Sequence, residues 1–172
     1  FNRIRPIPAA VTDQPMKFAK PLPPFLIARH RDRRASRSPE QRARLQDLAA
    51  HGQTPRAMVI ACCDSRVMVS DVFGSEAGEF FVHRNIANLV PPCTPDGRQH
   101  GTSATIEYAV TMLKVRHLIV MGHSQCGGVA GCFDIETGQP GAPNPDSFVG
   151  HWLEVLAPSV PPLRHLPRDQ AM

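Results

Sequence analysis

Two separate segments of the chain end in side chains that can bind a soft metal ion. Residues 58–66 are an apolar run followed by Cys-Cys-Asp-Ser-Arg, and residues 118–128 place a histidine and a cysteine after a second apolar run. Zinc binds thiolates and imidazoles in tetrahedral sites, and catalytic zinc sites keep one of the four positions open. Cys62, His123 and Cys126 are therefore candidate zinc ligands.

The spacing of these ligands suits a catalytic zinc site. His123 and Cys126 are three residues apart, so one turn can supply both, while Cys62 comes from a neighbouring strand end. The fourth position is then free for water or for the carboxylate of Asp64. Zinc lowers the pKa of a bound water to about 7, which generates hydroxide near neutral pH.

Asp64 and Arg66 are the candidate catalytic pair beside this site. They are two residues apart in a predicted turn, where an arginine can hold a carboxylate with two hydrogen bonds. Such a pair would keep Asp64 ionised and oriented to accept the proton of a zinc-bound hydroxide. The hydroxide would then present its lone pair to an electrophile.

Two other uses of the cysteines stay open at this point. A closed structural zinc site could add Cys63 as a fourth ligand. Adjacent residues of an extended chain point to opposite sides, however, which favours a packed thiol at Cys63. A redox thiol pair is the second alternative, but these cysteines lack the C-x-x-C spacing. We expect Cys93 and Cys132 to be ordinary thiols.

Alternating strand and helix patterns predict how these residues are positioned. Buried strands are expected in the run from Met58 and at residues 79–85 and 117–122. Three helices are expected to begin at caps: one at 38–52 with a capping box at Ser38 and Gln41, one after Thr102–Ser103, and one at 148–156 after Ser147. Two more are expected at 67–74 and from about Cys126. This alternation indicates an α/β fold with a mainly parallel sheet, in which sites form beyond the carboxyl ends of the strands.

Composition divides the chain into three parts. Residues 1–35 carry six prolines without a regular period and suggest an N-terminal arm or extended segment. Residues 36–157 form the predicted zinc-binding α/β domain. Residues 158–172 contain four prolines and no period, and we expect an irregular tail.

Charge and composition argue against several classes of partner. Residues 29–34 hold four arginines without interleaved aromatic residues, so we interpret them as a solvated segment and expect no nucleic-acid partner. The sequence contains no run of 18 apolar residues, which is the length that a membrane-spanning helix needs. Five cysteines, an odd number that includes an adjacent pair, suit reduced thiols. Since the first residues show no signal-peptide pattern either, we expect a cytoplasmic protein.

Together these residues resemble the β-class carbonic anhydrases. The matching motifs are Cys62-x-Asp64-Ser65-Arg66, the segment Gly78-Glu-Phe-Phe-Val-His-Arg-Asn-Ile-Ala-Asn88, and Gly122-His123-x-x-Cys126-Gly-Gly128. The resemblance implies a three-layer α/β/α fold around a mainly parallel sheet, with zinc on Cys62, His123 and Cys126. It also implies Asp64 and Arg66 as the catalytic dyad, and reversible hydration of CO₂ to bicarbonate and a proton by attack of zinc-bound hydroxide.

The resemblance further implies a homodimer or higher homo-oligomer, because the substrate pocket of the family lies at a dimer interface. Gln53, Phe81 and Tyr108 match positions that line this pocket. Glutamine can donate a hydrogen bond to a bicarbonate oxygen, and the two aromatic rings can form an apolar wall for CO₂. Plain core packing is the alternative role for Phe81 and Tyr108.

Some members of the family have a closed state in which the aspartate ligates zinc and bicarbonate occupies an allosteric pocket. A tryptophan of that pocket is replaced by Val59 here, so we expect the open, water-bound form, although Asp64 stays a possible fourth ligand. Arg84, part of the same pocket in those members, is expected to be a structural ion-pair partner. His83, His100 and His117 match no zinc position, and we expect surface or packing roles for them.

The chain departs from the family after about residue 156. Family members continue there for tens of residues, with a further strand and helices, whereas the tail of this chain matches none of that. We therefore expect a C-terminally truncated family member. Two hypotheses about function follow. The first is an active zinc lyase that acts on CO₂, or a close relative that acts on COS or CS₂. The second is a zinc-binding fragment without catalytic activity.

Overall fold

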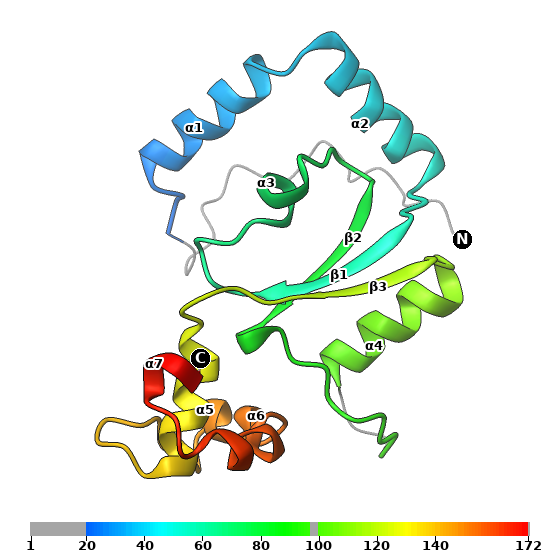
Figure 1. Cartoon of the computed structure of the whole chain (residues 1–172). Coiled ribbons are helices and arrows are strands. Elements are labelled where there is room, and N and C mark those ends of the chain that lie inside the picture. The colour runs from blue at the N-terminus through cyan, green and yellow to red at the C-terminus, as the bar shows by residue number, and fades with distance from the viewer. Residues whose placement is uncertain (1–19, 97–99, 172) are drawn as a thin grey trace. The chain divides into compact units, whose positions relative to one another are not determined.

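The computed structural model describes residues 20–96 and 100–171, and it contains a small parallel sheet with helices on both of its faces (Figure 1). The strands are β1 (Ala57–Cys62), β2 (Phe80–Asn85) and β3 (His117–Met121). The α-helices are α1 (Pro24–Ala35), α2 (Pro39–His51), α3 (Val69–Phe73), α4 (Gly101–Glu107), α5 (Gly127–Thr137), α6 (Phe148–Leu153) and α7 (Arg168–Ala171). Short 3₁₀ turns occupy η1 (Ile86–Asn88), η3 (Ala157–Ser159) and η4 (Pro161–Leu163), and a π-helical turn, η2 (Tyr108–Met112), extends α4.

The sheet has the order β2-β1-β3, and both strand pairs are parallel. Every residue of the central strand β1 is buried, as expected for a continuous apolar run covered on both faces. Cys62 is the last residue of β1 and pairs with Asn85, the last residue of β2. The chain leaves β3 at Met121, one register position before the level of Cys62. The carboxyl ends of all three strands therefore meet at one edge.

Helices cover both faces of the sheet, which confirms the predicted three-layer α/β arrangement. On one face, Met58 and Ile60 pack with Ala109 of the segment that continues α4. On the other face, Val59 and Ala61 pack with Val69 of α3. Figure 1 shows α3 and α4 on opposite sides of the strands.

A third apolar cluster lies beyond the carboxyl edge of the sheet. Phe133 of α5 and Leu153 of α6 are buried in it together with Cys62 and Cys126. Figure 1 shows α5, α6 and α7 gathered past the ends of the strands. The core of this region is therefore continuous with the candidate zinc ligands.

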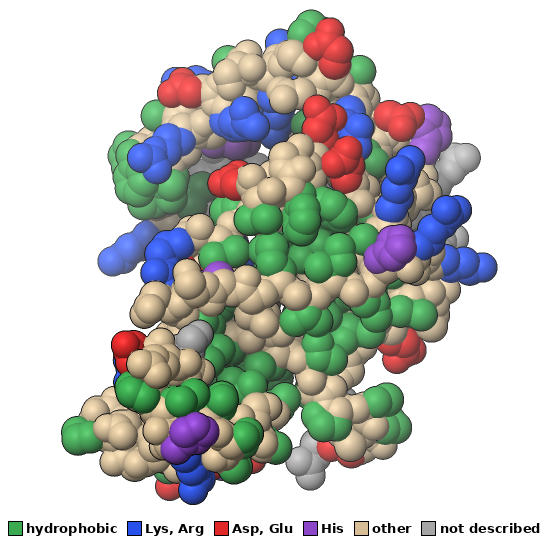
Figure 2. Space-filling model, in the orientation of Figure 1, with side chains coloured by type: hydrophobic (Ala, Val, Ile, Leu, Met, Phe, Trp, Pro, Cys, Tyr) green, Lys and Arg blue, Asp and Glu red, His purple; other side chains and the backbone are tan. Residues whose placement is uncertain are grey.

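Strand β3 forms an edge of the described sheet, and its side chains are incompletely covered. Leu118 and Val120 are 50% and 55% exposed. Figure 2 shows hydrophobic side chains gathered on both sides of this strand. Exposed apolar surface of this extent beside an edge strand is typical of an interaction surface.

Residues 24–35 form helix α1, so the expectation of an extended segment is wrong for this part of the N-terminal arm. Pro24 occupies the first helical position, where its fixed φ and missing N–H are tolerated. No residue of α1 is buried. Residues 1–19 lie outside the described part of the chain. Internal contacts divide the chain into two compact units, with the boundary between Ala43 and Arg44, within α2. The predicted domain boundary between residues 35 and 36 stays a prediction.

The cap predictions hold at two helices and fail at a third. Ser38 accepts from the backbone N–H of Gln41, and the Gln41 side chain accepts from the backbone N–H of Ser38, both at 3.2 Å, which is the predicted capping box. Ser147 caps α6 by accepting from Gly150. Helix α4, in contrast, begins at Gly101 without a side-chain cap. The Thr102 side chain is buried instead, because its hydroxyl contacts partners on β2.

The C-terminal tail is more regular than its proline content predicts. Residues 157–171 form two 3₁₀ turns and helix α7, with Val160 buried in the core beyond the sheet. Pro161 opens η4 and Pro158 is the second residue of η3, positions that suit the fixed φ of proline. Arg168 holds the tail to α5 through two hydrogen bonds to the Asp134 carboxylate, at 2.7 and 2.8 Å. The expectation of an irregular tail is therefore wrong.

None of the helices that the structure describes is long and apolar enough to cross a membrane.

Candidate metal centre

The three predicted zinc ligands come together at the carboxyl edge of the sheet. Cys62 ends β1, His123 follows β3 by two residues, and Cys126 immediately precedes α5. Because β1 and β3 are neighbouring parallel strands, their ends bring these residues to one place. The Sγ atoms of Cys62 and Cys126 and a ring nitrogen of His123 all lie within 4.8 Å of one another. Among the described residues, this is the one such group of three possible ligands.

The distances within this group fit a tetrahedral zinc ion. Two thiolates bound at about 2.3 Å to a tetrahedral zinc lie about 3.8 Å apart. The Sγ atoms of Cys62 and Cys126 are separated by 3.8 Å. Cys63 is exposed and does not belong to the group. The arrangement therefore offers three ligands and leaves one position of a tetrahedron open.

The His123 ring is oriented with one nitrogen toward the two thiols. Its Nδ1 lies 2.9 Å from the Ser124 carbonyl oxygen, which can only accept, so the proton belongs on Nδ1. Its Nε2 is buried and has no hydrogen-bond partner among the described residues. A buried polar atom without a partner is costly in a native protein. A zinc ion would satisfy this nitrogen, and the donor set therefore fits the metal.

The environments of the two thiols differ. Burial by itself raises the pKa of Cys62, but interactions with the His123 side chain and with the backbone amides of Asp64 and Ala87 outweigh it and lower this pKa overall. At Cys126 burial dominates and raises the pKa of the thiol. Without a metal, Cys62 is therefore the thiol that ionises more readily. This matters for zinc binding because zinc binds the thiolate form.

Asp64 and Arg66 form the predicted pair. The Arg66 side chain donates to both carboxylate oxygens of Asp64, at 2.9 and 2.7 Å, and the Arg66 backbone N–H donates to one of them at 2.9 Å. These hydrogen bonds hold the pKa of Asp64 well below its usual range. One Asp64 oxygen lies 4.0 Å from Nε2 of His123. An ionised, immobilised carboxylate therefore stands directly beside the three ligands.

A strained backbone surrounds the site. Gln125, between the two ligands of the second segment, has a φ of 55°, and Ala87 and Asn88 in turn η1 have φ values of 61° and 46°. Such left-handed conformations cost free energy in residues other than glycine and cluster at functional sites. The Asn85 side chain stabilises this turn, because it accepts from the Leu89 N–H and donates to the Leu89 carbonyl, both at 2.8 Å.

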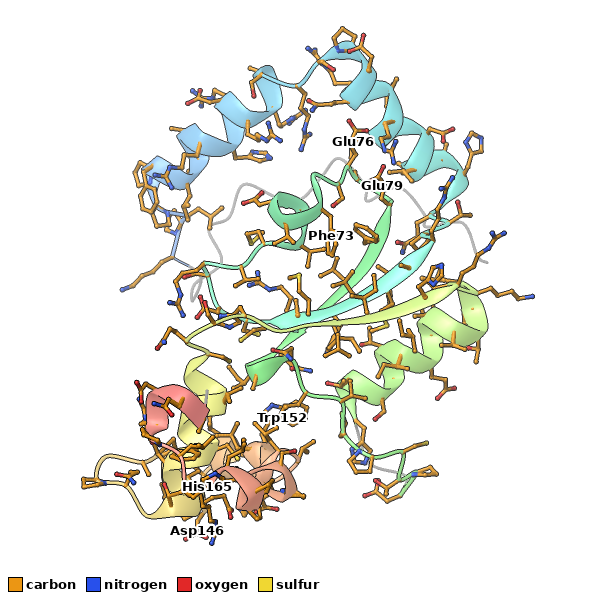
Figure 3. All side chains as sticks on the ribbon, in the orientation of Figure 1. Phe73, Glu76, Glu79, Asp146, Trp152 and His165 are labelled. Atoms are coloured by element: carbon orange, nitrogen blue, oxygen red, sulfur yellow. The ribbon has the colours of Figure 1, made fainter. Side chains whose placement is uncertain are left out.

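Close packing fixes helix α5 against this turn. A Cβ atom on Gly128 would lie 2.8 Å from Cβ of Ala87 and 2.9 Å from Cγ2 of Ile86. Only glycine permits this approach without a shift. From the other side, the Trp152 indole N–H of α6 donates to the Ile86 carbonyl at 2.8 Å. Figure 3 shows Trp152 between the helices beyond the sheet and the chain that leaves β2.

The predicted pocket residues lie away from the ligands of their own chain. The rings of Phe81 and Tyr108 are 5.9 Å apart and inclined by 32°, and Tyr108 is 40% exposed. Phe81 pairs with Met58, four residues before Cys62, which corresponds to about 13 Å along the strand. Gln53 is exposed in the loop before β1. The structure thus brings Phe81 and Tyr108 together, and their role in a pocket stays a prediction.

Arg84 contacts the site in a way that the sequence analysis missed. It was expected to form an ion pair, but no carboxylate of a described residue lies within salt-bridge distance of its guanidinium. The guanidinium donates instead to the backbone carbonyls of Cys62, Asp64 and Val67. Carbonyl partners leave no mark in the sequence, although a half-buried arginine at the end of a strand needs some partner.

The remaining histidines take the surface and packing roles that were expected. His83 is half-buried and its Nε2 lies 3.0 Å from the Thr102 hydroxyl, and burial lowers the pKa of His83. His100 lies 2.7 Å from an oxygen of Asp96. His117 is exposed at the start of β3.

Comparison with known proteins gives the family of this chain. Residues 57–171 match the family model described as carbonic anhydrase, so the expectation that the tail after residue 156 lies outside the family pattern is wrong. Beta carbonic anhydrase 3 of Arabidopsis thaliana is 40% identical over 121 residues, which are 70% of this chain and 45% of that protein. The β-carbonic anhydrase CcaA is 31% identical, with a TM-score of 0.73 over 86% of this chain and 65% of that one.

A further match is to tetrameric β-carbonic anhydrases of the filamentous ascomycete Sordaria macrospora. It has 33% identity and a TM-score of 0.62, and it covers 77% of this chain and 60% of the matched chain. The present chain is thus shorter than its relatives and spans 45% of the length of the Arabidopsis protein. The motifs, the fold and the ligand geometry agree with these matches, and the chain belongs to the β-carbonic anhydrase family.

Proposed function

We propose that this chain carries the active centre for zinc-dependent, reversible hydration of CO₂ to bicarbonate and a proton. The observation that carries the proposal is the buried Nε2 of His123, which lacks a partner among the described residues and lies beside two thiols and an arginine-held carboxylate. Each of these groups has a use in that reaction. Membership of the β-carbonic anhydrase family supports the same activity.

Cys62, His123 and Cys126 would hold the zinc ion. When bound there, zinc supplies a Lewis acid that lowers the pKa of water to about 7. Two thiolates and one neutral imidazole neutralise the charge of the ion and leave one position for the reacting water. The Nδ1–H of His123 keeps its ring in the ligating orientation through the bond to Ser124, as is common for metal-bound histidines.

Asp64 would orient the water that attacks CO₂. Its carboxylate is ionised and can only accept hydrogen bonds, so it would hold the water proton and turn the lone pair toward the carbon atom. Arg66 occupies both oxygens of Asp64 and also donates to the Gln125 carbonyl at 3.1 Å. This anchoring favours a role as acceptor over a role as fourth zinc ligand, and supports the open form of the site.

A second copy of the chain would complete the substrate pocket. Phe81, Tyr108 and Gln53 are too far along the sheet to face the ligands of their own chain, but Tyr108 and Gln53 are exposed and can face another subunit. The apolar surface beside β3 would support self-association, and the Sordaria relatives are tetrameric. We also infer a cytoplasmic location, because the cysteines are all free and the zinc ligands require reduced thiols.

A zinc-binding fragment without activity is the competing function. It is favoured by the separation of Phe81 and Tyr108 from the ligands within one chain, because a chain that does not associate would lack the pocket wall. Such a fragment would bind zinc at the same three residues. It would not accelerate CO₂ hydration above the buffer rate.

The proposal is tested by stopped-flow CO₂ hydration with Asp64→Asn, with the zinc content measured on the same samples. We expect wild type to be active, and the variant to retain its zinc and lose about 100-fold or more of the rate, as for removal of a positioned general base. Asp47→Asn, which changes an exposed carboxylate on α2, is the matched control and should keep the rate. Full activity in Asp64→Asn would remove the dyad from the mechanism, and a zinc-loaded wild type without activity would establish the inactive fragment.

A further inference from the structure

Arg84 is bound to the loop that carries both a zinc ligand and the catalytic carboxylate. Its Nε donates to the Cys62 carbonyl at 2.8 Å, and one terminal nitrogen donates to the carbonyls of Asp64 and Val67 at 2.6 and 2.8 Å. The other terminal nitrogen lies 3.3 Å from the Met68 sulfur. One side chain thus spans the whole loop from the end of β1 to the start of α3.

The position of Arg84 in the sheet explains this reach. Arg84 is the fifth residue of β2 and pairs with Ala61, one residue before Cys62. Its side chain therefore starts on a rigid strand beside the point where the loop leaves β1. Within residues 63–67, two backbone N–H groups donate to backbone carbonyls: Cys63 donates to Asn85 of β2 at 2.9 Å and Val67 donates to Asp64 at 3.1 Å.

We propose that Arg84 is a positioning residue that fixes residues 62–68 so that Cys62 and Asp64 reach the metal centre together. Arg84 ties this loop to β2, whereas Arg66 ties it to the turn between His123 and Cys126. A planar guanidinium can serve carbonyls that lie in different directions, which a lysine ammonium on a flexible stem does less well. The proposal rests on the proposed zinc site, because positioning matters there, but the hold on the loop is independent of any metal.

The experiment compares Arg84→Met and Arg84→Lys with Arg44→Met. Arg44 is the matched control, because it also ties down a loop: it donates to the Ala77 carbonyl at 2.6 Å and pairs with Glu76 and Glu79. That loop lies at the opposite edge of the sheet. Zinc affinity is measured by competition with a chelator, and the ligand field by the visible absorption of the Co²⁺-substituted protein.

We expect Arg84→Met to weaken zinc binding by about 10- to 100-fold, as for loss of groups that orient metal ligands, and to change the Co²⁺ spectrum. Arg84→Lys should recover part of the affinity. Arg44→Met should keep the affinity and the spectrum of wild type, whatever its effect on thermal stability. Wild-type affinity and spectrum in Arg84→Met would overturn the proposal. If Arg84→Met does not fold, the same comparison is decided by Arg84→Lys.

Hydrogen exchange of the metal-free protein separates this proposal from the zinc assignment. The amides of Cys63 and Val67 should exchange at least several-fold faster in Arg84→Met than in wild type, with no such change in Arg44→Met. If wild type binds no zinc but these amides exchange faster, the proposed function fails while the hold on the loop stands. Unchanged exchange at both amides would show that Arg84 does not fix the loop.

Discussion

The arginines at the two edges of the sheet differ in their partners. At the amino edge, Arg44 pairs with the carboxylates of Glu76 and Glu79 and with the Ala77 carbonyl, and Figure 3 labels both glutamates near α3. At the carboxyl edge, Arg84 has carbonyl partners, and Arg66 pairs with the Asp64 carboxylate. Arg44 and Arg66 each pair with carboxylates, whereas Arg84 holds its loop through backbone carbonyls.

The histidines of the two edges also differ in whether their ring nitrogens have partners. At the amino edge, the exposed His51 on α2 pairs with Asp47 at 2.7 Å. At the carboxyl edge, the buried Nε2 of His123 has no partner among the described residues, and Gln125, two residues further along, has a left-handed backbone conformation. Structural regions satisfy their polar groups, whereas binding regions keep one donor atom free for a ligand. This difference can be tested residue by residue.

The largest effect is expected for His123→Ala. Removal of one of three ligands should reduce bound zinc from about one per chain to near zero at micromolar free zinc, because the remaining two thiols cannot complete a site. His51→Ala at the other edge should keep its zinc. Metal analysis after dialysis measures both variants. Equal zinc in both would mean that His123 is not a ligand.

Gly128→Ala should destabilise the protein by about 1–3 kcal/mol, as for overpacking of a tight contact. The added Cβ would lie 2.8 Å from Cβ of Ala87 and would push α5 away from turn η1. Gly127→Ala is the matched control, because a Cβ at that position meets nothing within 4 Å. Urea denaturation of both variants measures the difference, and equal stabilities would show that α5 does not pack on η1 this closely.

Trp152→Phe should cost about 1 kcal/mol, mainly through loss of the hydrogen bond to the Ile86 carbonyl. Phe148→Ala, at a side chain that is 99% exposed on the same helix, should leave the free energy of unfolding unchanged in a monomer. Thermal unfolding followed by circular dichroism measures both variants. A larger loss in Phe148→Ala would indicate that a partner copy covers that face of α6.

The smallest effect is expected for Asp134→Asn, which releases the C-terminal tail from α5. The hydrogen bonds from Arg168 lower the pKa of Asp134, so this ion pair stabilises the fold above the ordinary carboxyl pKa of about 4. Its contribution is lost as the pH falls through the lowered pKa. Arg168 is half exposed, and we expect a loss of about 0.5 kcal/mol at pH 7.

The pH dependence of the Tm is the control for the Asp134→Asn prediction. The Tm of Asp134→Asn should lie below that of wild type at pH 7, and the two values should converge as the pH approaches 2. A constant difference across this range would mean that the variant acts through packing and not through the charge of Asp134.

Strands and ligands could be predicted because each leaves a local mark in the sequence. The runs before Cys62 and before His123 are short, apolar and bounded by polar residues, and the parallel order brings their ends together. Burial was predicted for both, but only β1 is buried along its whole length, and β3 is largely exposed. The capping box at Ser38 is equally local. These features need no knowledge of distant contacts.

Other features depend on tertiary contacts that have no sequence pattern. The carbonyl partners of Arg84 can be any residue type. Thr102 has the residue type of a cap but is buried against β2. The proline-rich tail is ordered by burial of Val160 and by the ion pair of Arg168. In each case the decisive partner lies far away in the sequence, and only the fold identifies it.

X-ray absorption spectroscopy at the zinc edge of the zinc-loaded chain tests the central claim most directly, because it counts the ligands without depending on activity. The structure predicts two sulfur ligands at about 2.3 Å and one imidazole nitrogen at about 2.0–2.1 Å, with an oxygen in the fourth position. Three sulfur ligands would bring Cys63 into the site and make it a closed structural centre. A shell without sulfur would contradict the assignment of Cys62 and Cys126 altogether.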